Sequence, residues 1–389
     1  MNYLFNFKKL LKAYYGCRLN KRRTINASKF EFDFENKLLQ LEQELIDKTY
    51  HPGRSICFAI KEPKLREVFA ADFRDRIVHH LLVNYLEPIF EPKFIFHSYA
   101  CRKNKGAILA VKNLQKAIKH YPKNKKLFYL QIDISAFFTS LDKNILFSII
   151  SSRIKNPDIL WLTKTIIFHD PCANYFRKGD TTALNNVEKH KSLFHTSINK
   201  GLPIGNLSSQ FFANVYLDKV DQFAKHTLKI KNYFRYADDM VIIHHNNNQL
   251  NAWNQQIDAF LQNNLKLHLH PDKKIQLPVS RGINFLGYII KPNNILVRNR
   301  TVKKLKNKLF TFNKQILNQY PSQPIYLWTP ELCQKFQHIF TSINSYYGLF
   351  RHADTFRLRR HLYEKHFNIL KLYLLPANKS FDYFIWFNF

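Results

Sequence analysis

Cysteine is scarce in this chain, and its placement excludes two common kinds of covalent or metal stabilisation. The chain has 389 residues and only five cysteines. They are odd in number, widely spaced and form no CxxC pair: Cys17, Cys57, Cys101, Cys172 and Cys333. This pattern argues against a disulfide framework and against a zinc module. It fits a reducing compartment, so we expect a cytoplasmic protein.

Long apolar stretches are also missing. No run of about 18 apolar residues occurs, so we expect no transmembrane helix. Residues 1–8 contain no apolar stretch of signal-peptide length. The histidine pairs lack the i, i+4 spacing of a helical zinc site, and we interpret them as structural: His79-His80, His244-His245 and His268/His270.

Acidic residues are few compared with basic ones. Lys and Arg number 60 against 28 for Asp and Glu, which gives a formal net charge of +32. Such an excess favours a polyanionic partner, because Lys and Arg release counterions from a phosphate backbone. Nucleic acid is the first interpretation, and an anionic membrane surface is the second. Aromatic residues can stack on bases, although we expect most of the 35 Phe side chains in the core.

Hydrophobic periodicity predicts an α+β fold. Helices are expected at 1–50, 73–91, 106–120, 143–168, 207–228 and 248–264. Strands are expected at 54–72, 127–134, 233–243, 265–269 and 283–298, with basic helix beyond them. The segment 171–200 is polar and irregular, which is typical of a functional loop or an insertion. The order predicts a central antiparallel sheet with helices, followed by a helical C-terminal domain.

Two adjacent acids, Asp238 and Asp239, lie between apolar, β-forming runs. The runs 233–236 and 241–243 are typical of paired strands, so the acids are expected at or near a hairpin turn. Adjacent carboxylates repel each other and lose hydration unless a positive charge lies between them. Mg²⁺ suits this position because it binds few carboxylates and leaves room for substrate phosphates. An ordinary polar turn is the alternative, since Asp is common in turns.

A third acid, Asp133, follows the apolar strand 127–132. A strand that ends in Asp can direct a carboxylate and a backbone carbonyl into one site, although a polar strand end is the simpler interpretation. If the fold brings Asp133 to Asp238, the carboxylates can bind two divalent ions roughly 3.5–4 Å apart, as in in-line phosphoryl transfer.

Four motifs, in this order, resemble those of reverse transcriptases. They are FYLQIDISAFF at 128–138, GLPIGNLSSQ at 201–210, YADD at 236–239 and FLGY at 285–288. The resemblance spans roughly residues 55–300 and includes the stretches 66–76 and 98–106. The motif at 204–210 is similar to that of diversity-generating retroelements, and related phage-defence enzymes share much of the pattern. The segment 171–200 departs from the compact retroelement form and leaves these two branches open.

The resemblance implies a right-hand polymerase with fingers, a palm of antiparallel sheet plus helices, and a helical thumb. The expected domains are an N-terminal helical extension at 1–50, fingers at 51–126, a palm at 127–298 that contains the insertion 171–200, and a thumb and tail at 299–389. The C-terminal helices carry basic residues that suit a grip on phosphates. They are Lys303, Lys304, Lys306, Lys308, Arg351, Arg357, Arg359 and Arg360. We expect the aromatic C-terminus to dock on the body of the protein or on a partner.

The resemblance also implies a catalytic set. Asp133 and Asp238 are expected to be the main ligands of two Mg²⁺ ions, for which Mn²⁺ can substitute. The backbone carbonyl of Ile134 would assist, with Asp239 close by. Lys273 resembles the lysine that protonates the leaving pyrophosphate, a role that the neighbouring Lys274 could also fill.

Further residues are expected to bind the incoming nucleotide. Arg66, with Lys64 nearby, would clamp the triphosphate by charge-assisted hydrogen bonds. Phe138 matches the ring that excludes a ribose 2′-hydroxyl, although core packing is its alternative. Gly205 and Gln210 would lie under the nucleotide and the template base.

The function that the resemblance implies is RNA-directed DNA polymerisation, in a retroelement or a phage-defence system. The implied partners are an RNA template, such as a dedicated non-coding RNA, the DNA product, dNTPs, and an accessory protein or a second copy of the chain. No membrane partner is expected. The alternative is an RNA-binding maturase or chaperone whose polymerase site is idle.

Overall fold

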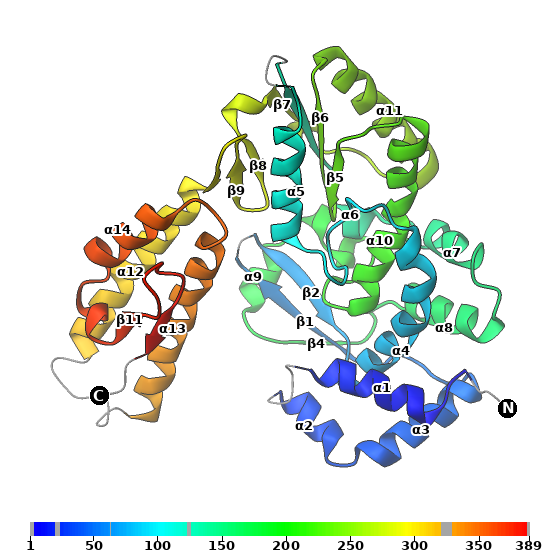
Figure 1. The fold of residues 1–389 in the computed structure, drawn as a ribbon. Coiled ribbons are helices and arrows are strands. Elements are labelled where there is room, and N and C mark those ends of the chain that lie inside the picture. The colour runs from blue at the N-terminus through cyan, green and yellow to red at the C-terminus, as the bar shows by residue number, and fades with distance from the viewer. Residues whose placement is uncertain (1–3, 20–23, 63, 123–125, 320–328, 387–389) are drawn as a thin grey trace. The chain divides into compact units, whose positions relative to one another are not determined.

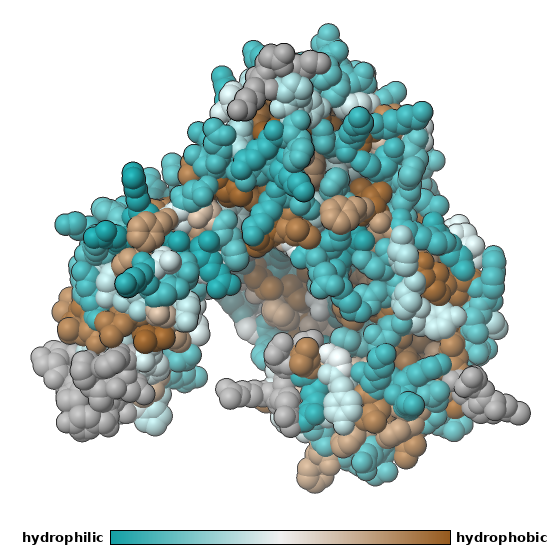
Figure 2. Space-filling view, in the orientation of Figure 1, coloured by the Kyte–Doolittle hydropathy of each residue, from teal (hydrophilic) through white to brown (hydrophobic). Residues whose placement is uncertain are grey.

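A computed structural model of the chain describes residues 4–19, 24–62, 64–122, 126–319 and 329–386. The chain divides into two compact units. The first comprises Met1–Gly106, Leu130–Ile242 and Asn247–Ile275, and the second comprises Ala107–Tyr129, Ile243–Asn246 and Gln276–Phe389. Within the described residues, no helix combines the length and apolar character that a membrane span requires. The face drawn in Figure 2 is mostly hydrophilic, as expected of a chain with 60 Lys and Arg residues.

The first unit begins with three helices, where the periodicity predicts helix. They are α1 (Phe7–Arg18), α2 (Ile25–Glu31) and α3 (Phe34–Ile46). The apolar positions of α3 share one face, and Leu38, Leu41 and Leu45 are fully buried. The next helix, α4 (Phe73–Phe90), is covered by α1 and supplies the buried Ile77 and Leu82.

A three-stranded sheet follows, with strand order β2-β1-β4 (Figure 1). Its strands are β1 (Ser55–Ile60), β2 (Arg66–Ala70) and β4 (Tyr175–Arg177). The predicted strands at 54–72 form an antiparallel pair in which Ile60 faces Arg66. The expectation of an irregular segment at 171–200 is wrong in part. This segment adds β4 parallel to β1 and forms helix α9 (Thr181–Asn185), too short for periodicity to reveal.

A four-stranded sheet has the order β5-β6-β3-β7. Its strands are β3 (Phe128–Asp133), β5 (Tyr233–Tyr236), β6 (Asp239–His244) and β7 (Ile275–Pro278). The helices that lie between these strands in the sequence include α6 (Phe137–Ser140), α7 (Lys143–Ser151), α8 (Pro157–Phe168), α10 (Leu207–Gln222) and α11 (Asn247–Leu265). The strand predicted at 265–269 is wrong: α11 runs to Leu265, and only Leu269 forms an isolated bridge, to Ile134.

The second unit contains α5 (Ala107–Lys119) and an antiparallel sheet of order β10-β9-β8. The strands are β8 (Ile283–Phe285), β9 (Tyr288–Ile290) and β10 (Ile295–Val297). Three helices follow, α12 (Asn299–Gln319), α13 (Pro330–Phe350) and α14 (Phe356–His366), of which α12 and α14 are rich in Lys and Arg. The architecture is therefore α+β, as predicted.

The aromatic C-terminus folds back as a hairpin of β11 (Leu374–Pro376) and β12 (Phe384–Trp386). The Phe384 ring is buried and packs against Tyr347 and Phe367, each with ring centroids 4.7 Å apart. This confirms the expectation that the tail docks on the body. One member of the expected basic surface is not exposed, because Arg359 is buried and pairs with Asp382.

Candidate active site

The Asp238 turn lies where the sequence predicts it. Strands β5 and β6 pair with Tyr236 opposite Asp239, so Ala237 and Asp238 form a two-residue hairpin turn. Ala237 has φ 53°, in the left-handed region that such turns require. A non-glycine residue is strained in this conformation, so the contacts around it must hold it there. The turn therefore places Asp238 at the tip of a rigid hairpin.

Asp133 and Asp238 come together in the folded chain. Asp133 ends β3, which neighbours β6 in the sheet, and its carboxylate lies near enough to that of Asp238 to raise the pKa of Asp238. Burial raises the pKa of Asp238 to about 6, the Asp133 charge adds to the rise, and the Arg66 charge opposes it. Two carboxylates in contact share a proton or attract a cation. A shared metal site would require this proximity of the two carboxylates.

Lys273 lies at the same site. Its Nζ atom donates to Oδ2 of Asp133, whose side chain is 18% exposed. The backbone N–H of His270 donates to the Asp133 carbonyl at 2.8 Å, which fixes the end of β3. Lys274 instead donates to Asn251 Oδ1 at 3.4 Å. Of the two lysines that the sequence left open, the structure therefore places Lys273 beside the carboxylates.

Asp239 is held differently. The amide Nε2 of Gln131 donates to both of its carboxylate oxygens, at 3.0 and 3.2 Å. Among the residues that the structure describes, no group of three or more His, Cys, Asp or Glu side chains could hold a metal ion. The expected convergence of three acids is thus reduced to a contacting pair, Asp133 and Asp238. Ile134 follows Asp133 and is buried.

The donor chemistry of the pair fits Mg²⁺. Two neighbouring carboxylates, of which that of Asp133 is partly exposed, offer hard oxygen ligands. Mg²⁺ binds through one or two carboxylates and keeps its other positions for water or phosphate oxygens. A third protein ligand is therefore not required for the site to accept this ion.

The expected nucleotide-binding residues lie on three elements of the first unit. Arg66 is exposed at the start of β2 and lowers the pKa of Asp238, while Lys64 is exposed in the preceding turn. Phe137 is core at 2% exposure, whereas the Phe138 ring is only half-buried and contacts it edge-on at 5.3 Å. Gln210 is exposed near the start of α10.

Gly205 has a structural reason to be glycine. Its φ is +128°, and a Cβ atom there would lie 2.8 Å from Val68 Cγ1 and 3.0 Å from the Phe69 carbonyl oxygen. The backbone of β2 approaches here, since the N–H of Phe69 donates to the Ile204 carbonyl at 2.9 Å. The glycine thus allows the loop before α10 to pack on the strand that carries Arg66.

Arg235 is the residue that sequence reasoning missed. It lies in β5 and is fully buried. Its guanidinium nitrogens form a bidentate ion pair with the carboxylate oxygens of Asp221 of α10, with N–O distances of 2.6–3.0 Å. Its guanidinium also donates to Ser98 Oγ at 2.9 Å and to the Ala237 carbonyl at 3.1 Å. Arg235 therefore ties the strained turn to the core. The available signal was a lone charge inside an apolar strand.

Comparison with known proteins identifies the family. The family model described as "Reverse transcriptase (RNA-dependent DNA polymerase)" matches residues 60–290, more than half of the chain. The chain belongs to this family. All the expected site residues lie within the matched range.

This reverse transcriptase chain is 23% identical over 298 residues to "Protein YkfC" of Escherichia coli, covering 68% of this chain and 74% of that protein. It is 23% identical over 355 residues to "Group II intron-encoded protein LtrA" of Lactococcus lactis, covering 74% of this chain and 55% of LtrA. The chain thus spans about half the length of LtrA. A solved telomerase structure from Candida albicans, with a fragment of telomeric RNA, has a TM-score of 0.45 and 12% identity over 82% of this chain and 55% of that one.

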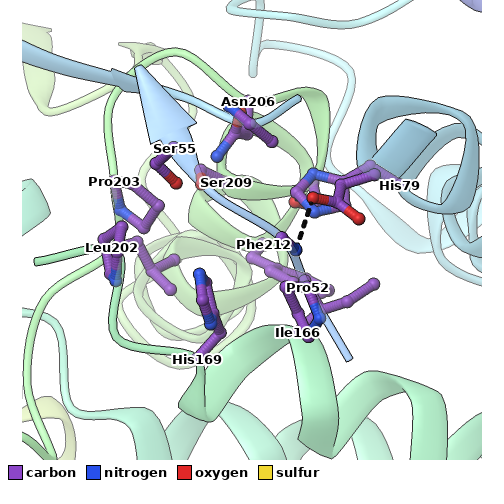
Figure 3. A pocket seen from close by; sticks show the side chains of 15 residues that line it. Pro52, Ser55, His79, Ile166, His169, Leu202, Pro203, Asn206, Ser209 and Phe212 are labelled. Atoms are coloured by element: carbon purple, nitrogen blue, oxygen red, sulfur yellow. Dashed lines mark hydrogen bonds between the residues drawn. The ribbon is translucent and has the colours of Figure 1, made fainter. Parts of the chain in front are cut away.

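A pocket with both polar and apolar lining residues borders the reverse transcriptase motif at 201–210 (Figure 3). His79 of α4, Asn206 and Ser209 lie around it. The Ser208 hydroxyl lies 3.0 Å from Nδ1 of the buried His79, and Asn206 Oδ1 accepts from the Ala71 N–H at 3.0 Å. These two bonds attach the start of α10 to α4 and to the residue that follows β2.

The buried imidazole of His79 is expected to make stability depend on pH. Burial lowers the pKa of His79 to about 3. The unfolded chain therefore binds the proton first, and the free energy of unfolding falls as pH drops below about 6.5, by up to about 1.4 kcal/mol per pH unit. We expect urea unfolding at pH 7 and pH 5 to reveal this slope. His79→Gln, which can still bond Ser208, should have a shallower slope, and an equal slope in both proteins would contradict the assignment.

Proposed function

We propose that the protein is an RNA-directed DNA polymerase that adds dNTPs to the 3′ end of a primer by two-metal phosphoryl transfer. The contact between Asp133 and Asp238, with Lys273 and the Arg66 charge beside them, carries this proposal. When bound there, Mg²⁺ would activate the primer hydroxyl and neutralise charge on the leaving pyrophosphate.

The chain's own residues then have distinct roles. Arg66, supported by Lys64, binds the triphosphate through charge-assisted hydrogen bonds. Lys273 donates a proton to the departing pyrophosphate, a role supported by the position of its ammonium beside the acids that would hold the metal ions. The half-exposed Phe138 ring excludes a 2′-hydroxyl by steric overlap and so favours dNTPs.

Primer extension tests the proposal. Wild-type protein with Mg²⁺, dNTPs and a primed RNA should incorporate nucleotides, and Asp238→Ala should not. Equal incorporation by the two proteins would leave only a binding role for this chain.

A second candidate is an RNA-binding maturase or chaperone with an idle polymerase site. The net charge of +32 and the similarity to an intron-encoded protein favour it. It predicts that wild type and Asp238→Ala both bind RNA and that neither incorporates nucleotides. The neighbouring acids favour the polymerase, since two carboxylates close together repel each other and form a ready site for a divalent cation.

The biological setting is proposed from the resemblance. A prokaryotic retroelement and a phage-defence system both fit, with a cytoplasmic location, a dedicated RNA, and an accessory protein or second copy of the chain as partners. Neighbouring genes distinguish them: a template repeat accompanies the first, and a non-coding RNA with a second defence gene accompanies the other.

A further inference from the structure

The segment 171–200 binds the residue that follows Arg66. Glu67 of β2 is 5% exposed, and both of its carboxylate oxygens accept hydrogen bonds from this segment. The Ser192 hydroxyl donates to Oε2 at 2.7 Å, and the Leu193 N–H donates to Oε1 at 2.8 Å. Because a buried carboxylate needs both partners, Glu67 holds the segment firmly against β2.

The same segment reaches the short helix that carries Phe138. The Thr139 hydroxyl lies 2.8 Å from the His190 carbonyl oxygen and 2.9 Å from that of Ala136, so its single proton is available to either acceptor. Where the segment returns, the Leu202 N–H donates to the carbonyl of Phe138 at 2.8 Å. Gly201 has φ +82°, and a Cβ atom there would lie only 2.7 Å from Leu193 Cδ2. His190 and the residues just after the segment therefore both contact α6.

Apolar packing makes the attachment stiff. Phe194 packs against Phe69 of β2 with ring centroids 5.4 Å apart, and Tyr175 of β4 contacts both rings, at 5.1 and 6.1 Å. Leu184 of α9 is buried with Phe69 and Cys57 in one cluster. Strand β4 is also hydrogen-bonded to β1. The segment is thus packed against, and hydrogen-bonded to, the sheet that bears Arg66.

We propose that residues 189–196 form a brace that sets the separation between Arg66 and Phe138, and that Ser192 and Glu67 are positioning residues for nucleotide selection. This inference rests on the proposed polymerase function, in which Arg66 binds the triphosphate and Phe138 faces the sugar. The two side chains contact different parts of one nucleotide. Their separation therefore decides whether a 2′-hydroxyl meets the ring.

Ser192→Ala tests the brace. Loss of this hydrogen bond should raise KM for dNTPs roughly 3- to 10-fold, with a smaller change in kcat. The preference for dNTPs over rNTPs should fall by a similar factor. Ser192→Thr keeps the hydroxyl and should restore both values. Ser197→Ala removes an exposed hydroxyl from the same segment and should match wild type.

Thr139→Val removes the contact at the other end and is expected to act in the same direction, so the brace is tested even if Ser192→Ala does not fold. If folded Ser192→Ala and Thr139→Val both keep the wild-type KM for dNTPs and the wild-type preference for dNTPs over rNTPs, the brace proposal is wrong. The proposed polymerase function would still stand. Absence of incorporation by wild type, measured first, would overturn the proposed function and the brace with it.

Discussion

Asp133→Asn and Asp238→Asn are each expected to lower kcat for primer extension about a thousandfold or more. Each change removes one charge from the contacting pair that would hold the metal ions. A metal-bound transition state typically gains several kcal/mol, and about 4 kcal/mol corresponds to a thousandfold change in rate. Single-turnover extension of a primed RNA at saturating dNTP and Mg²⁺ measures the effect on kcat.

Asp239→Asn is the matched comparison, because Asp239 is adjacent in sequence and held by Gln131. We expect it to lower kcat much less than the other two changes. Thermal unfolding of all three variants separates a catalytic effect from a loss of structure. Equal losses of kcat for Asp238→Asn and Asp239→Asn would show that all three acids act together, as the sequence alone predicts.

The acidic hairpin was predictable because its information is local. Apolar, β-forming runs on both sides of Asp238 and Asp239 allow little other than a hairpin, and antiparallel pairing of Tyr236 with Asp239 needs only a two-residue turn. Asp133 was predictable for a similar reason, since the strand before it is continuous and apolar. Whether Asp239 joins Asp133 and Asp238 was not predictable, because this depends on the direction in which the Asp239 side chain points from β6.

Other parts of the site depend on contacts between distant residues. Glu67 and Ser192 are 125 positions apart, and no pattern near either one indicates the other. Strand β4 has three residues and becomes a strand only through its pairing with β1. Periodicity cannot detect an element that short, which is why the segment 171–200 was expected to be irregular.

Arg235→Met is expected to lower the free energy of unfolding by about 3–5 kcal/mol, the usual result of leaving one member of a buried ion pair without its partner. Arg235 and Asp221 side chains are both fully buried, so the remaining carboxylate cannot be hydrated without opening the core. Such a loss is a large part of the about 5–15 kcal/mol that stabilises a typical domain. Urea unfolding followed by circular dichroism measures it, and Arg360→Met, which breaks an exposed pair with Glu364, should leave the unfolding midpoint unchanged.

The double variant Asp221→Leu/Arg235→Met separates the two roles of Arg235. With both charges gone, the core no longer holds an unpaired ion, so the double variant should be more stable than Arg235→Met alone. The hydrogen bond to the Ala237 carbonyl is still missing, and the turn that carries Asp238 remains unsupported. We therefore expect stability to recover in part while primer extension stays low. Recovery of both together would mean that Arg235 serves only the stability of the core and does not position the turn.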